Sequence, residues 1–281
     1  MSRVAVVTDS SASLPEGVAE ELGVVVVPLQ VVIGATSYDE GVATTEMVAE
    51  ALRDFTPVST SRPTPAAMAE VYAAAAAAGA TAIVSIHLSR RLSGTFDSAE
   101  VAARDASVPV TAVDTGQVGH AIGYAVVAAA EVARAGGSAD EVAAAARARV
   151  EASTSLFYVD TLEYLRRGGR VGAAAALIGS ALAVKPLLGL AGGRIVPLEK
   201  VRTAGKALTR LEDLAVDAAG ERSVEVTVAH LASPDRAEQL AARLADRVSL
   251  DAPVRVAELG AVLGAHVGPG MVAVCVTPAL D

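Results

Sequence analysis

The stretch TAIVSIHLSRRLSGT, residues 81–95, decides the fold: an apolar run is followed by a turn of hydroxyl and basic side chains and then by the start of a helical pattern. Short apolar runs rich in β-branched residues and bounded by turn residues are typical of buried strands. A helix directly after such a strand is the beginning of a βαβ unit. This stretch therefore predicts a strand, a loop and a helix in a parallel α/β sheet.

The same alternation continues on both sides of this stretch. Further apolar runs occupy residues 4–8, 24–33 and 109–114. Between them, residues 64–79 begin with Thr-Pro and end with Gly, the usual residues of a helix start and a helix end. Ser13 and Glu16 have capping-box spacing, which predicts another helix start. We expect residues 1–155 to form an N-terminal α/β/α domain with a mostly parallel sheet.

The pattern changes near residue 155. Two apolar runs, at 186–190 and 195–199, are separated by Ala-Gly-Gly, which predicts an antiparallel hairpin. An apolar helix is expected at residues 172–183. Further helical and apolar segments follow at 203–219, 224–229, 234–248, 254–257 and 271–277. Residues 156–281 therefore predict a C-terminal α/β domain with an antiparallel sheet.

Composition excludes several classes of protein. The 281 residues are 52% hydrophobic and 3% aromatic, with 23 basic and 32 acidic side chains and a net charge of −9. This balance argues against disorder and against a nucleic-acid partner. The uncharged stretch 171–184 is too short to span a bilayer. The lone Cys275 is expected to be buried, and a start that lacks a signal-peptide pattern predicts a cytoplasmic protein.

Three segments are candidate ligand-binding sites. Ser93 and Gly94 lie between a strand and a helix, where parallel sheets expose a crevice and helix starts favour anions. An ordinary capped turn is the competing interpretation. Thr60 and Ser61 offer two hydroxyls before another helix start, although a solvated loop explains them equally well. His266 precedes the sequence Val-Gly-Pro-Gly, and a histidine beside so rigid a turn is a candidate for orienting a polar group.

Other motifs are absent from the sequence. It contains no GxxxxGK[ST] loop and no GxGxxG after the first strand, so nucleotide binding has little support. His87, His120 and His230 have no partner at metal-ligand spacing, and we expect neither a metal nor a cofactor. The basic turn at residues 166–170 suits either a phosphate or an acidic partner, or is simply solvated. The residues alone therefore predict a two-domain α/β protein with a ligand crevice and no more specific function.

Short motifs in a characteristic order extend this interpretation. They are Val7-Thr8-Asp9-Ser10, Leu14-Pro15, Thr60-Ser61-Arg62-Pro63, Leu92-Ser93-Gly94-Thr95, Leu165-Arg166-Arg167-Gly168-Gly169-Arg170, Ile178-Gly179, Val184-Lys185-Pro186, the stretch 195–203 and His266-Val267-Gly268-Pro269-Gly270. Together they resemble the DegV family of bacterial fatty-acid-binding proteins. Ser13, Arg62 and Val267 depart from the family's usual acidic residue, glutamine and threonine.

The resemblance implies a two-domain DegV-like (EDD) fold with a long-chain fatty acid held between domains 1–155 and 156–281. The residues it implies are Thr60, Ser93 and His266 at the carboxylate, Ser61 and Gly94 as their neighbours, Arg170 at the entrance and Arg202 on a partner surface. The chain would be a non-catalytic subunit. An ATP-binding kinase partner would phosphorylate the carboxylate for phospholipid synthesis, and transient membrane-surface contact is compatible with this role.

Two alternatives remain open at this point. One is a free-standing enzyme that acts on a small anionic metabolite, with Ser93 and His266 as its catalytic groups. The other is a carrier of a different amphiphilic acid, such as an isoprenoid acid.

Overall fold

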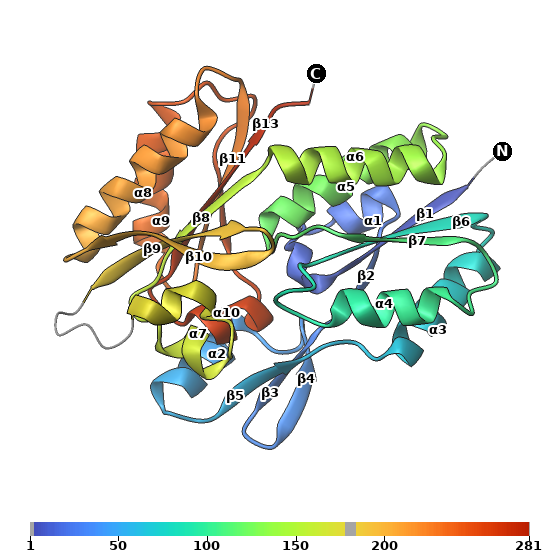
Figure 1. Ribbon diagram of the computed structural model, residues 1–281, viewed down its shortest axis with the longest axis horizontal. Helices are drawn as coiled ribbons and strands as arrows, with labels where there is room; N and C mark the ends of the chain where they lie inside the picture. Colours follow the sequence, from blue (N-terminus) through green and yellow to red (C-terminus); the bar gives the residue numbers. More distant parts are fainter. Residues whose placement is uncertain (1–2, 178–183, 281) are drawn as a thin grey trace. The chain divides into compact units, whose positions relative to one another are not determined.

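The computed structural model describes residues 3–177 and 184–280 (Figure 1). The chain divides into two compact units, the first made of Met1–Gln30 and Ser61–Glu151, the second of Val31–Thr60 and Ala152–Asp281. The chain thus passes from one unit to the other three times. The sequence-based boundary placed residues 31–60 in the N-terminal domain, whereas this division groups them with the second unit.

The first unit is built on a parallel sheet with the strand order β2-β1-β6-β7. Its strands are β1 (Val4–Asp9), β2 (Val25–Val27), β6 (Ala82–His87) and β7 (Val110–Asp114). Its helices are η1 (Ser10–Ala12), α1 (Val18–Leu22), α3 (Pro65–Ala77), α4 (Thr95–Ala103), α5 (His120–Arg134) and α6 (Ala139–Ala152). Helices α3 and α4 lie on one face of the sheet, and α1 and α5 lie on the other (Figure 1). The predicted parallel α/β sheet is confirmed.

Local signals explain most of these elements. The Thr64 hydroxyl accepts a hydrogen bond from the Ala67 amide at the start of α3, and Gly79 follows that helix with a φ of 93°. The predicted capping box at Ser13 is wrong. Ser13 ends η1 in the left-handed conformation, with a φ of 50°, and α1 begins only after Gly17. The left-handed backbone of Ser13 differs from the extended backbone that a capping serine typically has at a helix start.

The second unit contains a six-stranded sheet with the order β10-β9-β8-β13-β11-β12. Its strands are β8 (Thr154–Tyr158), β9 (Lys185–Ala191), β10 (Arg194–Val201), β11 (Val224–His230), β12 (Arg255–Glu258) and β13 (Val272–Pro278). All neighbours pair antiparallel except β11 and β12, which are parallel. The predicted hairpin is formed by β9 and β10. The predicted antiparallel character of the C-terminal sheet is therefore confirmed.

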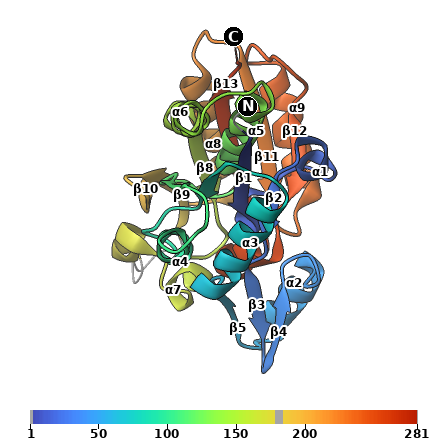
Figure 2. The same ribbon diagram turned by 90° about the vertical axis from the view of Figure 1, so that its right-hand side faces the viewer.

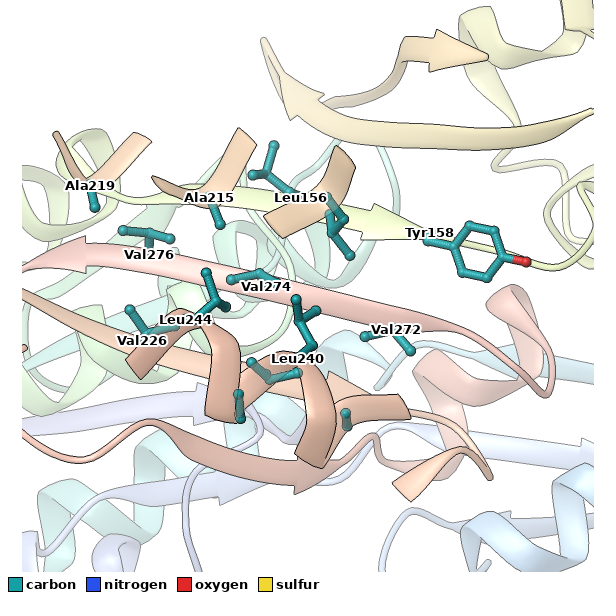
Figure 3. Close-up of a cluster of buried hydrophobic side chains, with 14 of the residues drawn as sticks. Leu156, Tyr158, Ala215, Ala219, Val226, Leu240, Leu244, Val272, Val274 and Val276 are labelled. Atoms are coloured by element: carbon teal, nitrogen blue, oxygen red, sulfur yellow. The ribbon is translucent and has the colours of Figure 1, made fainter. Parts of the chain in front are cut away.

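Helices α8 (Ala204–Ala219) and α9 (Pro234–Ala245) cover one face of this sheet. Every second residue of β13, at positions 272, 274 and 276, points into the core between sheet and helices (Figure 3). Residues four positions apart on α8 and α9, among them Leu211 and Leu240, meet them from the other side. Cys275 is buried in β13, as expected.

The remaining elements of the second unit are short. Residues 31–60 contribute to a small sheet with the order β4-β3-β5, and they contain α2 (Figure 2). These elements are β3 (Gln30–Ile33), β4 (Thr36–Asp39), α2 (Thr45–Arg53) and β5 (Val58–Ser61), and the later ones are α7 (Glu163–Arg167), η2 (Gly172–Leu177) and α10 (Ala261–Val267). Helix α10 packs against α2 and α7. Pro28 divides the apolar run 24–33 between β2 and β3, which belong to different sheets.

The helix expected at residues 172–183 is a 3-10 helix in its first part, η2. At its start, a Cβ on Gly172 would lie 2.8 Å from the Ile195 carbonyl oxygen, so this turn packs closely against β10. Residues 178–183, which include the Ile178-Gly179 motif, lie outside the described residues.

The packing of α8 predicts a stability difference between two identical substitutions. Leu211 is fully buried, whereas Leu280 is 53% exposed. We expect Leu211→Ala to lower the free energy of unfolding by about 2–5 kcal/mol, because it removes buried contacts and leaves a cavity. Leu280→Ala should change it by less than about 0.5 kcal/mol. Urea denaturation of both variants measures this, and equal losses would contradict the assigned core.

Candidate functional site

A hydrogen bond connects Thr60 and His266. The Thr60 Oγ1 of β5 lies 2.9 Å from Nε2 of His266, and the two residues are 206 positions apart in the sequence. His266 was expected beside a rigid turn, and it lies in the last turn of α10, with Gly268 directly after that helix at a φ of 74°. The structure thus brings together two of the residues that the resemblance implied as neighbours, although their motifs are far apart in the sequence.

The imidazole of His266 occupies a confined, positively biased environment. Its burial, together with the nearby charge of Arg170, lowers the pKa of His266 to about 4, so the ring is neutral at pH 7. Its Nδ1 is buried and has no hydrogen-bond partner among the described residues. A Cβ on Gly168 would lie 2.3 Å from this Nδ1. Only a glycine at position 168 therefore leaves the ring in place.

Residues 31–60 hold the helix that carries His266. Glu40 accepts a hydrogen bond from the Val262 amide at the start of α10, at 2.9 Å. The Thr45 hydroxyl donates to the Leu259 carbonyl just before that helix, at 2.7 Å. An acidic group at a helix start satisfies free amides and complements the helix dipole. Together with Thr60, these contacts fix α10 at both of its ends.

The Ser93-Gly94 turn lies in the first unit at the start of α4. The Ser93 Oγ lies 2.9 Å from the Thr95 Oγ1 and accepts from the Thr95 amide at 3.3 Å. The Arg62 Nη1 donates to the Gly94 carbonyl at 3.2 Å. A Cβ on Gly94 would lie 1.6 Å from that Nη1, so the absence of a side chain admits the guanidinium. The turn therefore combines two hydroxyls, a helix start and one basic group.

The other predicted site residues, Ser61, Arg170 and Arg202, each have different neighbours. Ser61 is exposed, and its hydroxyl donates to the Gln30 Oε1 at 3.1 Å. Neighbours on a strand point to opposite faces, so Ser61 and Thr60 face different ways. Arg170 follows α7 and donates to the Gly168 carbonyl. Arg202 is exposed between β10 and α8.

The predicted site residues thus fall into two groups. Ser61, Ser93 and Gly94 belong to the first unit, and the other members, Thr60, Arg170, Arg202 and His266, belong to the second.

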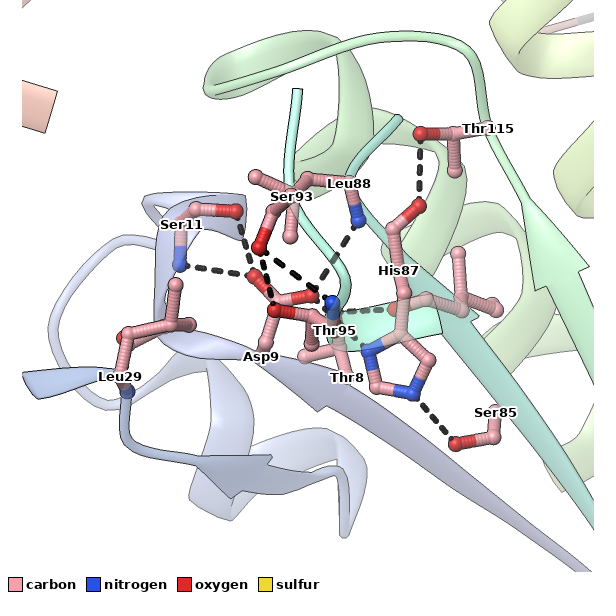
Figure 4. A network of polar contacts seen from close by, with 12 residues as sticks. Thr8, Asp9, Ser11, Leu29, Ser85, His87, Leu88, Ser93, Thr95 and Thr115 are labelled. Atoms are coloured by element: carbon pink, nitrogen blue, oxygen red, sulfur yellow. Dashed lines mark hydrogen bonds and ion pairs between the residues drawn. The ribbon is translucent and has the colours of Figure 1, made fainter. Parts of the chain in front are cut away.

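Sequence reasoning missed a buried polar network in the first unit (Figure 4). The His87 Nδ1 lies 2.9 Å from the Asp9 Oδ2, and the His87 Nε2 lies 2.7 Å from the Ser85 Oγ. All three residues are fully buried. Asp9 and His87 end two neighbouring parallel strands, β1 and β6. That signal was available, because polar residues that end adjacent parallel strands meet at one edge of the sheet.

The order hydroxyl, imidazole, carboxylate in this network has the connectivity of a hydrolytic triad. Its Ser85 hydroxyl, however, is buried and already accepts a hydrogen bond from the Tyr72 hydroxyl at 2.9 Å. A nucleophile must reach a substrate, and this one is enclosed. The network is therefore an internal support in the structure.

The described residues contain neither a cluster of metal ligands nor a membrane-spanning helix. No three or more His, Cys, Asp or Glu side chains in that part of the chain are grouped so as to hold a metal ion. Over the same residues, none of the helices combines the length and the apolar character needed to cross a membrane.

The chain matches a family model over residues 3–279, described as "Uncharacterised protein, DegV family". A DegV domain-containing protein of Streptomyces coelicolor is 57% identical over 279 residues, which cover 99% of each chain. A DegV domain-containing protein of Mycobacterium bovis is 35% identical, covering 97% of this chain and 96% of the relative.

Solved structures agree with these matches. A fatty-acid-binding DegV family protein from Thermus thermophilus superposes with a TM-score of 0.92 at 33% identity, covering 99% of this chain and 100% of the other. DegV of Bacillus subtilis, a fatty acid binding protein, superposes with a TM-score of 0.90 at 30% identity and the same coverage. The sequence and the fold lead to one conclusion: the chain belongs to the DegV family.

Proposed function

We propose that this protein binds a long-chain fatty acid and presents its carboxylate to an ATP-binding partner kinase, which forms an acyl phosphate for phospholipid synthesis. The protein itself is a non-catalytic carrier. The bonded pair of Thr60 and the neutral His266 is the observation that carries the proposal. The fatty acid binding of the Thermus thermophilus and Bacillus subtilis proteins supports the ligand class.

The protonation of His266 suits a carboxylate ligand. Its Nδ1 has no acceptor among the described residues, so the neutral ring keeps its proton on Nε2 and donates it to the Thr60 Oγ1. The Thr60 hydroxyl proton is then free for a carboxylate oxygen. In the proposal, Ser93 donates a second hydrogen bond, and Ser61 and Gly94 are neighbours of these groups.

Neutral donors serve a carrier better than a bidentate arginine would. Hydroxyl groups orient a carboxylate without strong charge pairing, so the oxygen remains available to attack a phosphoryl group. Affinity comes from the acyl chain, at about 0.8 kcal/mol for each buried methylene, or roughly 12 kcal/mol for some fifteen methylenes before ordering costs. In this proposal Arg170 lies near the entrance and Arg202 on the kinase-facing surface.

The ligand class can be tested on the purified protein. Native mass spectrometry followed by solvent extraction should recover one long-chain fatty acid per chain. Recovery of a different amphiphilic acid would replace the fatty acid while keeping the carrier role. A protein that neither retains nor takes up an added fatty acid would disprove the proposal.

The head-group assignment predicts weaker fatty acid binding when Thr60 or Ser93 loses its hydroxyl group. Thr60→Val removes a hydroxyl without changing the side-chain shape, and we expect it to weaken fatty acid binding by about 10- to 100-fold, because a hydrogen bond to a charged group is lost. Ser93→Ala should have a similar effect. Phosphorylation of the bound acid by the kinase should fall in both variants.

The matched control is Thr209→Val on the exposed surface of α8, where the hydroxyl donates only within its own helix, to the Gly205 carbonyl. It should bind as the unchanged protein does. Equal affinities for all three variants and the unchanged protein would overturn the assignment of Thr60 and Ser93.

His266 also predicts a pH dependence of stability. Its pKa is about 4 when folded and about 6.5 when unfolded, so between these values the unfolded chain binds more protons. The stabilisation is complete above pH 6.5 and is lost as the pH falls toward 4, by at most about 3 kcal/mol. In the ligand-free protein, the difference in unfolding free energy between the unchanged protein and His266→Gln should shrink over that range. A difference that stays constant would contradict the neutral, buried imidazole.

A further inference from the structure

The carboxyl group of Asp9 is the meeting point of four hydrogen-bond donors (Figure 4). Its Oδ1 accepts from the Ser11 amide at 3.1 Å and from the Ser11 hydroxyl. Its Oδ2 accepts from the His87 Nδ1 at 2.9 Å and from the Leu88 amide at 3.2 Å. Asp9 is fully buried, so these contacts replace water entirely.

The hydrogen bonds beyond Asp9 run in one direction. The Tyr72 hydroxyl donates to the Ser85 Oγ at 2.9 Å. A carboxylate only accepts, so the His87 Nδ1, 2.9 Å from Asp9, carries a proton. In the neutral ring Nε2 then accepts from the Ser85 hydroxyl, 2.7 Å away. The acceptor capacity of Asp9 thus selects one tautomer and one orientation of His87.

The same carboxyl group anchors the loop that carries Ser93. Leu88, whose amide Asp9 accepts, is followed by Ser89, and the Ser89 carbonyl accepts from the Leu92 and Ser93 amides at 2.9 and 3.0 Å. The Ser93 Oγ then meets Thr95 at the start of α4. Hydrogen bonds, together with the peptide bond between Leu88 and Ser89, therefore connect the buried Asp9 carboxyl group to the backbone of Ser93.

We propose that Asp9 is a positioning residue for the Ser93 hydroxyl: it fixes the start of the 88–95 loop and thereby sets the geometry in which Ser93 meets a ligand carboxylate. This inference rests on the proposed function in one respect, the contact between Ser93 and the ligand. It assigns to Asp9 no contact with the ligand itself.

Asp9→Asn provides the test, because the side chain keeps its size while one acceptor oxygen becomes a donor facing other donors. Affinity is measured for a long-chain fatty acid and for the alcohol of the same chain length. We expect the variant to bind the acid about tenfold more weakly and the alcohol nearly as well, because a hydrogen bond from Ser93 to a charged carboxylate is worth more than one to a neutral hydroxyl. Two-dimensional ¹⁵N spectra of His87 should show the proton moving from Nδ1 to Nε2.

The matched control is Tyr72→Phe, at the far end of the same network. It also loses a buried hydrogen bond, but it leaves all four contacts of Asp9 in place. It should keep the ratio of acid to alcohol affinity of the unchanged protein. If Asp9→Asn does not fold, His87→Asn and His87→Gln replace it. Asparagine can still donate to Asp9 and should keep the ratio, whereas glutamine reaches the Ser85 side and should lower it.

The outcomes separate this inference from the proposed function. If the unchanged protein binds neither ligand, both fail. If it binds the fatty acid, and Asp9→Asn weakens acid and alcohol equally, or Tyr72→Phe lowers the ratio as much, then fatty acid binding stands and the positioning role of Asp9 is overturned.

Discussion

The placement of the His266 imidazole in the second unit depends on a hydrogen bond between two residues far apart in the sequence, Thr60 and His266. The strands of the small sheet are only four residues long, and α10 is only seven residues long. Hydrogen bonds hold residues 31–60 and α10 together. Glu40 and Thr45 bind at the start of α10, and Thr60 binds at its end. A short helix that is marginal by itself thus becomes a fixed support for one imidazole.

His87 in the first unit and His266 in the second have contrasting surroundings. In the first, both ring nitrogens of His87 have partners and the ring is fully buried, which makes it part of the framework. In the second, His266 has one bonded nitrogen and one without a partner among the described residues, and its pKa is lowered to about 4. A histidine with partners at both ring nitrogens adds rigidity to the structure around it.

Regular elements were predictable where local chemistry decides them. The start of α3 at Thr64-Pro65 and the hairpin at 191–193 follow from capping and turn chemistry alone. The pairing of Asp9 with His87 requires knowledge of which strands are neighbours, and so it was missed although each residue ends a recognisable strand. The capping box predicted at Ser13 failed for the same reason. The Asp9 side chain caps η1 instead, and it is oriented by His87 and Leu88, which are distant in the sequence.

The position of residues 31–60 in the second unit also affects the synthesis of the chain. Their partner helix α10 is made some 200 residues later, a delay of roughly 10–40 s at ordinary rates of translation. During that time side chains that end up buried, such as Val31, Val48 and Leu52, lack part of their final surroundings. The first unit can assemble while the ribosome is still working, but the second cannot. A nascent chain of this protein therefore exposes part of these apolar side chains until α10 has emerged from the ribosome.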